Sequence, residues 1–187
     1  MFLTLISSQQ ANIIIDWGGR ARLTEYGLAP INSGHNFNVA ATPGAVVTSR
    51  WLAPEILTPP HKGCDAQVME SKPADVFAFA MLAIEVFTGE VPFGEQKDGE
   101  VVLRILRGGR PEMPANSQAV GLTADMWKLL ESCWQQNPKK RPTMEEVVKR
   151  WEKFVEPDNN DNNILTECVE ITLVFRTDPI LNFLWST

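Results

Sequence analysis

The chain has 187 residues, of which 44% are hydrophobic and 21% charged, as is ordinary for one globular domain with a sizeable core. Its net charge of −6 provides no basic surface for nucleic acid, and no apolar run reaches the length of a membrane span. The three cysteines are scattered without the spacing of a metal site. We therefore expect an intracellular protein of the reducing cytoplasm.

The N-terminal part of the sequence predicts a short β-hairpin after an atypical leader, residues 1–10. Residues 13–15 are three isoleucines, and residues 20–23 alternate polar and apolar side chains. Gly18 and Gly19 lie between these two runs and supply a turn. The stretch from about residue 28 to residue 50 is rich in Asn, Gly, Ser, Thr and Pro, which predicts a long functional or mobile loop.

The sequence after residue 71 predicts a buried helix. Ser71 is a suitable N-cap residue, and Pro73 fits the first turn of a helix. Residues 75–87 are apolar on nearly every side, which is typical of a helix buried all round. Gly89 supplies the stop, because glycine readily adopts the left-handed conformation that ends many helices.

Three further helices are predicted, over residues 98–108, after Thr123, and from Thr143 onward. The last begins with Thr143-Met144-Glu145-Glu146, the pattern of a capping box. Residues 156–163 are polar and acidic, which indicates a linker, and residues 164–187 form a tail apolar enough to pack on something. The predicted fold class is therefore mainly α, with one short β-hairpin near the N-terminus.

Two opposite charges far apart in the sequence stand beside prolines and tryptophans. Glu55 ends the run Ser49-Arg50-Trp51-Leu52-Ala53-Pro54-Glu55, and Arg141 lies in Lys140-Arg141-Pro142. A carboxylate and a guanidinium can form a bidentate, charge-assisted pair. The alternative is two solvated surface charges that contribute little to stability.

Five stretches, in this order, resemble the second half of a eukaryotic protein kinase domain, of the tyrosine-kinase-like serine/threonine type. Residues 11–16 resemble the end of the catalytic loop, and residues 22–29 resemble the strand before the magnesium motif. Residues 51–55 resemble the end of the activation segment, residues 75–80 the central buried helix, and residues 133–142 the Cys-Trp…Arg-Pro stretch. The resemblance implies a kinase C-lobe over residues 11–155, with the N-lobe absent.

The resemblance implies transfer of the γ-phosphate of ATP to serine or threonine hydroxyls of a protein substrate, with Mg²⁺. Asn12 matches the family's magnesium-binding asparagine, and Glu25 stands where its magnesium-binding aspartate belongs. Ile14 is assigned to the cofactor-binding side, and Thr48 matches a threonine of the activation segment. The alternatives are a turn-capping Asn12, a loop-edge acid at Glu25 and an ordinary loop threonine at Thr48.

The catalytic loop departs from the family pattern. Counting back from Asn12, the position of the catalytic aspartate is occupied by Ser7, and a serine of ordinary pKa cannot act as the general base. No glycine-rich loop or N-lobe lysine precedes Ala11. The scaffold positions are kept, as the resemblance assigns structural roles to Glu55, Asp75 and Arg141. We therefore expect the chain to be inactive by itself.

Three interpretations remain open. The chain is a truncated, ATP-dependent protein kinase domain, or it is a pseudokinase-like module that holds protein partners. The third interpretation is a helical domain with chance matches to the kinase motifs.

Overall fold

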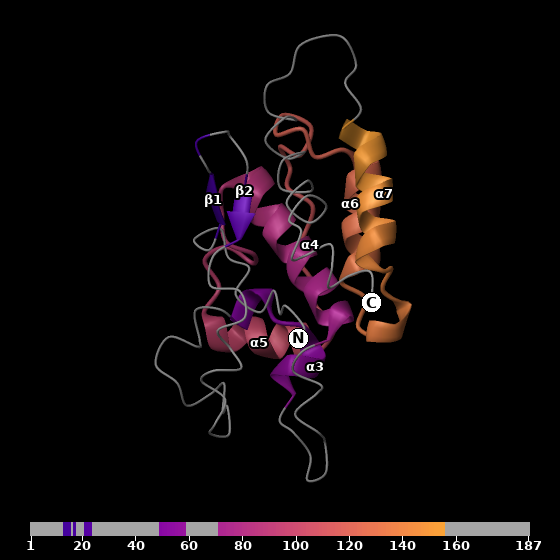
Figure 1. Ribbon diagram of the computed structural model, residues 1–187. Coiled ribbons are helices and arrows are strands. Elements are labelled where there is room, and N and C mark those ends of the chain that lie inside the picture. Colours follow the sequence, from indigo (N-terminus) through magenta and orange to yellow (C-terminus); the bar gives the residue numbers. More distant parts are fainter. Residues whose placement is uncertain (1–12, 16, 18–20, 24–48, 59–70, 156–187) are drawn as a thin grey trace.

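The structure, a computed structural model, describes residues 13–15, 17, 21–23, 49–58 and 71–155. Near the N-terminus, strands β1 (Ile13–Ile15) and β2 (Ala21–Leu23) pair in antiparallel fashion (Figure 1). Ile13 lies opposite Leu23, and Ile15 opposite Ala21. The predicted hairpin is therefore confirmed, while most of its turn lies outside the described residues.

The remaining regular elements of the described chain are helices, and the sequence predicted the four longest of them. The helices are η3 (Ser49–Trp51), α3 (Pro54–Leu57), α4 (Lys72–Thr88), α5 (Asp98–Leu106), α6 (Ala124–Cys133), η5 (Pro138–Lys140) and α7 (Met144–Val155). The sequence does not predict η3, α3 or η5, because three or four residues are too few to show a helical period.

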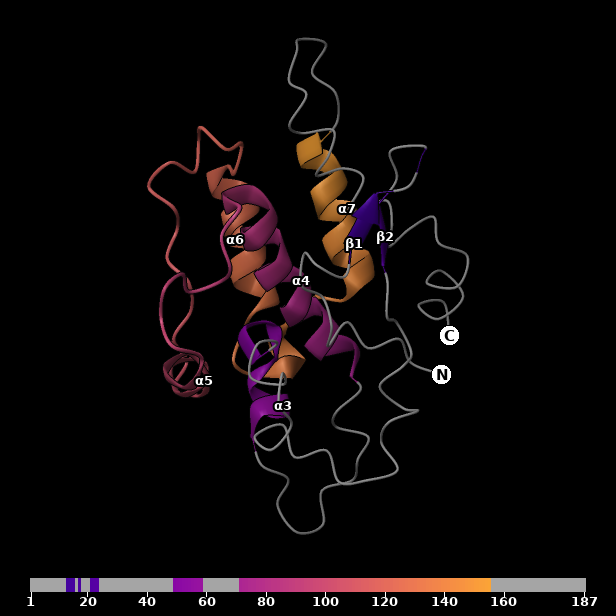
Figure 2. The ribbon, with the colours of Figure 1, turned by 90° about the vertical axis from the view of Figure 1, so that its left-hand side faces the viewer.

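Helix α4 forms the centre of the fold (Figures 1 and 2). The side chain of Ser71 accepts a hydrogen bond from the backbone of Ala74, and Gly89 ends the helix with φ of 70°. Phe77 is fully buried. Burying a side chain of this size contributes roughly 1.5–3 kcal/mol, so an apolar α4 is a large source of stability.

Helix α6 packs along α4, α7 packs on α6, and an aromatic contact joins α7 to α4. The ring of Trp151 on α7 meets that of Phe79 on α4 edge-on, with centroids 5.5 Å apart. Thr143 and Glu146 exchange hydrogen bonds of 3.2 and 2.8 Å with each other's backbone N–H, which confirms the predicted capping box. Helix α5 runs crosswise near α3, and appears end-on in Figure 2.

Several sequence predictions fall outside the described residues. They concern the leader (1–10), most of the long loop (28–50), the linker (156–163) and the tail (164–187). Among the helices that the structure does describe, none combines the length and apolar character needed to cross a membrane.

Candidate functional site

The candidate site is built around residues 49–58, which comprise η3 and α3 and are called here the anchor segment. Its N-terminal part is buried, from Ser49 to Pro54. Three of its polar side chains reach three different parts of the helical core. The segment is therefore fastened at several points along its length.

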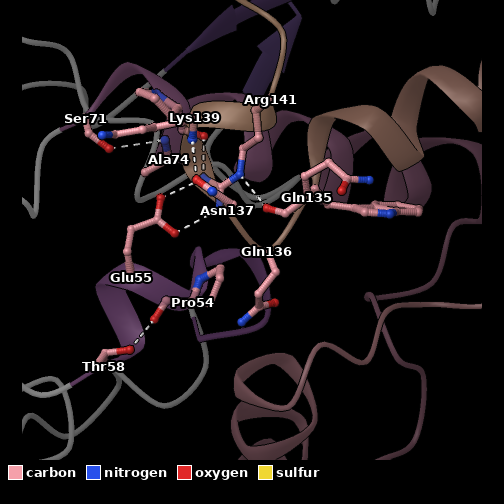
Figure 3. A network of polar contacts seen from close by, with 12 residues as sticks. Pro54, Glu55, Thr58, Ser71, Ala74, Gln135, Gln136, Asn137, Lys139 and Arg141 are labelled. Atoms are coloured by element: carbon pink, nitrogen blue, oxygen red, sulfur yellow. Dashed lines mark hydrogen bonds and ion pairs between the residues drawn. The ribbon is translucent and has the colours of Figure 1, made fainter.

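The C-terminal fastening is the pair formed by Glu55 and Arg141 (Figure 3). Nη1 of Arg141 donates to Oε1 of Glu55 at 2.6 Å, and Nη2 donates to Oε2 at 2.8 Å. The Arg141 side chain is 0% exposed and that of Glu55 is 16% exposed. The two charges form a bidentate pair shielded from water, rather than two solvated surface charges.

Arg141 also holds parts of the core that are far apart in the sequence. Its Nη1 donates to the carbonyl oxygen of Pro73 in the first turn of α4, at 2.8 Å. Its Nε donates to the carbonyl oxygen of Gln135 just after α6, also at 2.8 Å. The Cζ atom lies 5.2 Å from the centroid of the Phe77 ring. One guanidinium therefore joins the anchor segment, α4 and the end of α6.

The middle fastening joins Trp51 to Glu85. The indole N–H of Trp51 donates to Oε2 of Glu85 at 3.1 Å, and both residues are buried. Glu85 lies within the apolar run of α4, where an acid is costly to bury unless donors surround it. We did not predict this contact, although an isolated acid in an apolar helix was a signal that could have indicated it.

The N-terminal fastening is Arg50, another buried arginine that sequence reasoning missed. Its Nε donates to Oδ1 of Asp98 at 2.8 Å, at the start of α5. Its other nitrogens donate to the carbonyl oxygens of Pro92, Gly94 and Gln96 in the connection between α4 and α5. Arg50 therefore binds mainly main-chain oxygens.

A further guanidinium, that of Arg110, lies close to the Glu55–Arg141 pair. Its Cζ atom is 5.1 Å from the centroid of the Phe77 ring, the same ring that Arg141 contacts. Arg110 donates to the carbonyl oxygen of Trp134 at 2.8 Å. Burial, and then the positive charge of Arg141, lower the pKa of Arg110 to about 10, while Glu55 raises it. Arg110 still carries its charge at neutral pH, so Glu55 faces two cations.

Two further titratable side chains, Asp75 and Cys133, are buried in the described core. Asp75 is buried in the first turn of α4, where free backbone N–H groups favour an acid. Burial raises the pKa of the Cys133 thiol to about 12, so at neutral pH it is protonated and a poor nucleophile.

The predicted cofactor positions are not part of the site that the structure describes. Ser7, Asn12, Glu25 and Thr48 lie outside the described residues. Ile14 lies in β1, opposite Arg22, with only its backbone described. Within the described ranges, no three His, Cys, Asp or Glu side chains gather as a metal site would require.

Comparison with known proteins identifies the family. The family model for protein tyrosine and serine/threonine kinases matches residues 9–151. A putative serine/threonine-protein kinase/receptor of Acanthamoeba polyphaga mimivirus is 34% identical over 140 residues, which cover 75% of this chain and 8% of that protein.

Cellular proteins give similar matches. Dual specificity protein kinase shkD of Dictyostelium discoideum is 27% identical over 161 residues, covering 84% of this chain and 18% of its own length. Serine/threonine-protein kinase STY17 of Arabidopsis thaliana is 28% identical over 152 residues, covering 81% and 24%. The chain thus spans less than a third of the length of each of these relatives. These matches confirm the predicted resemblance: the chain belongs to the family of protein tyrosine and serine/threonine kinases and carries part of the kinase domain.

Proposed function

We propose that the chain acts as the C-lobe scaffold of a cytoplasmic, tyrosine-kinase-like serine/threonine protein kinase and does not transfer phosphate by itself. In this role it holds the end of the activation segment against the helical core and presents a protein substrate. The observation that carries the proposal is the buried, bidentate pair of Glu55 and Arg141. It joins the family's Ala-Pro-Glu stretch to the Arg-Pro stretch 86 positions away.

The scaffold role follows from where the anchor segment is fastened. Phosphoryl transfer depends chiefly on positioning and on neutralising the charge of the phosphates. A segment that is held at Arg50, Trp51 and Glu55 cannot shift without breaking contacts to the core. A rigid support of this kind is what a substrate hydroxyl needs to stay within reach of a γ-phosphate.

The cofactor roles remain part of the proposal. Asn12 and Glu25 would bind Mg²⁺, Ile14 would line the nucleotide side, and Thr48 would belong to the activation segment. Mg²⁺ bound to ATP supplies charge neutralisation at the phosphates. Glu25 is one methylene longer than the family's aspartate, and a displacement of about 1 Å can cost on the order of a hundredfold in rate.

The expected lack of activity rests on Ser7. A serine hydroxyl at the position of the catalytic aspartate offers no carboxylate to accept the proton of the substrate hydroxyl. Ser7 lies just before the first residue that the family model matches, so its assignment depends on counting back from Asn12. Activity must therefore be measured directly.

The first experiment incubates the purified chain with radiolabelled Mg-ATP and a generic serine/threonine substrate. We expect no incorporation above that of a heat-denatured control, because the general base is lacking. Incorporation that disappears in both the Asn12→Ala and Glu25→Gln variants, and persists in Gln118→Ala, would overturn the expected inactivity. Gln118 is a matched control because it is exposed and far in sequence from both candidate ligands.

A second candidate function is a pseudokinase-like module that binds protein partners. Ser7 favours it, as does a pocket of about 370 Å³ between the end of α4, the connection to α5 and the stretch before α6. Thermal unfolding with and without Mg-ATP separates the two functions. Stabilisation that Asn12→Ala abolishes favours a residual nucleotide site, and no change with Mg-ATP favours the binding module.

A further inference from the structure

The connection between α4 and α5 folds around the guanidinium of Arg50. Nη1 of Arg50 donates to the carbonyl oxygens of Pro92 at 2.8 Å and Gly94 at 2.9 Å. Nη2 donates to the carbonyl oxygen of Gln96. Residues 91–97, called here the α4–α5 loop, therefore turn their backbone oxygens toward one buried cation.

The same loop contains a backbone conformation that is unfavourable for its residue. Phe93 has φ of 68°, and in the described chain it is the one residue other than glycine with positive φ. The backbone N–H of Gly94 donates to the carbonyl oxygen of Val91 at 3.0 Å, which closes a four-residue turn. Proline at the second position and positive φ at the third is the pattern of a type II turn, where glycine or asparagine normally occupies the third position. A Cβ atom at Phe93 strains this turn.

Arg50 and the strain at Phe93 act on the same peptide groups. The carbonyl groups of Pro92 and Gly94 stand on either side of Phe93, and both accept hydrogen bonds from one nitrogen of Arg50. Bringing these oxygens together requires the chain to bend at Phe93. Hydrogen bonds from a charged donor are among the stronger ones, so they can hold a bend that the chain would otherwise leave.

We propose that Arg50 is a positioning residue that holds the α4–α5 loop in a strained form, so that this loop and the start of the anchor segment open and close as one unit. Loss of the Arg50 contacts releases the bend at Phe93, and opening of the loop deprives the Arg50 cation of its main-chain acceptors. This coupling goes beyond the proposed scaffold function, because it concerns which parts move together rather than what the scaffold supports.

The coupling has a structural consequence for the pocket beside the loop. Phe93, Gly94 and Gln96 line that pocket, and the Cζ atom of Arg104 lies 5.5 Å from the centroid of the Phe93 ring. Residues of this loop thus line the pocket and also provide the carbonyl oxygens that accept from Arg50. Any change that opens the loop is expected to weaken the hydrogen bonds of Arg50. Any change that weakens those hydrogen bonds must in turn favour the open loop, because coupling free energies are reciprocal.

Amide hydrogen exchange resolved by residue tests the coupling. The reporters are the N–H groups of Gly94, bonded within the loop, and Leu52, bonded to the carbonyl of Ser49 at 3.2 Å. Arg50→Lys keeps the positive charge and removes the planar guanidinium with its several N–H donors. In this variant we expect exchange at both reporters to accelerate by about tenfold or more. The exposed Arg107→Lys is the matched control and should change neither reporter. Acceleration at Leu52 with unchanged exchange at Gly94 overturns the proposal.

A pair of substitutions at Phe93 tests the role of strain. Both Phe93→Gly and Phe93→Ala remove the ring, but only glycine removes the Cβ atom that strains the turn. In the Arg50→Lys background we expect Phe93→Gly to restore slow exchange at Gly94 and Phe93→Ala to leave it fast. Equal exchange in the two double variants overturns the proposal. Should Arg50→Lys fail to fold, the single variants Phe93→Gly and Phe93→Ala still test the proposal. Exchange at Gly94 must then be slower in Phe93→Gly than in Phe93→Ala.

Discussion

Two buried arginines hold opposite ends of the anchor segment, and they do so with different acceptors. Arg141 makes a bidentate pair with Glu55, with side chains 0% and 16% exposed. Arg50 makes a single bond to Asp98, with side chains 11% and 29% exposed, and otherwise binds main-chain carbonyls. The first contact is a charge pair withdrawn from water, and the second is mainly a cation enclosed by the backbone.

This contrast predicts which chemical group contributes most to stability at each end of the anchor segment. A buried pair leaves an uncompensated charge when one partner is removed. Carbonyl oxygens carry no net charge, and water can replace a partly exposed carboxylate such as that of Asp98 at little cost. We therefore expect the carboxylate to matter at the Arg141 end, and the shape of the guanidinium to matter at the Arg50 end.

The largest expected effect comes from Arg141→Ala. Removing this guanidinium leaves the carboxylate of Glu55 partly buried without its partner, and frees the carbonyl groups of Pro73 and Gln135. We expect a loss of about 3–5 kcal/mol in the free energy of unfolding. Chemical denaturation monitored by tryptophan fluorescence measures it.

The neighbouring Lys140→Ala serves as the control for that measurement. Lys140 is exposed and lies in η5. Its removal should change stability by less than about 0.5 kcal/mol, as is usual for surface positions. Equal stability losses in the two variants would contradict the idea that the charge pair braces the fold.

An intermediate effect is expected when Glu55 and Arg110 are changed together. Glu55→Gln alone should cost roughly 1.5–3 kcal/mol, the value of hydrogen bonds to a charged group. Without this carboxylate, Arg110 and Arg141 face the Phe77 ring as two cations with no shared counter-charge. Arg110→Gln should therefore cost less in the Glu55→Gln background than in the unchanged protein.

A double-mutant cycle measures this coupling. We expect the two substitutions to deviate from additivity by about 0.5 kcal/mol or more, with the sign that indicates relief of repulsion. Additive losses would show that Glu55 serves Arg141 alone, and that Arg110 matters only through its bonds to carbonyls such as that of Trp134.

The smallest expected effect is that of Asp98→Asn. The amide keeps an acceptor for Nε of Arg50, and the side chain of Asp98 is already 29% exposed. We expect a loss below about 1 kcal/mol, and a loss that shrinks further at high salt. A cost equal to that of Glu55→Gln would remove the distinction between the two arginines.

Much of the fold could be predicted from local sequence patterns. The ends of α4 follow from Ser71 and Gly89, and the start of α7 follows from the capping box at Thr143. These signals can be recognised in the sequence because the groups that interact within each cap lie within a few residues of each other. Glu55 and Arg141 were found differently, through a family motif rather than through any local pattern.

The contacts that sequence reasoning missed share a physical cause. The carbonyl oxygens bound by Arg50 belong to every residue type, so no side chain marks them in advance. The same holds for the carbonyl of Trp134 that accepts from Arg110. The pairing of Trp51 with Glu85 involves side chains, but nothing local relates an indole to an acid on another helix.

The order of sequence motifs was enough to assign the family and the mainly helical class. Hydrophobic period, helix caps and motif order are properties of the chain read in one dimension. Packing of the folded chain brings main-chain oxygens of the α4–α5 loop around Arg50, and places two guanidiniums against the Phe77 ring. Such contacts depend on where main-chain groups and ring faces arrive after packing, and no residue type specifies that position alone.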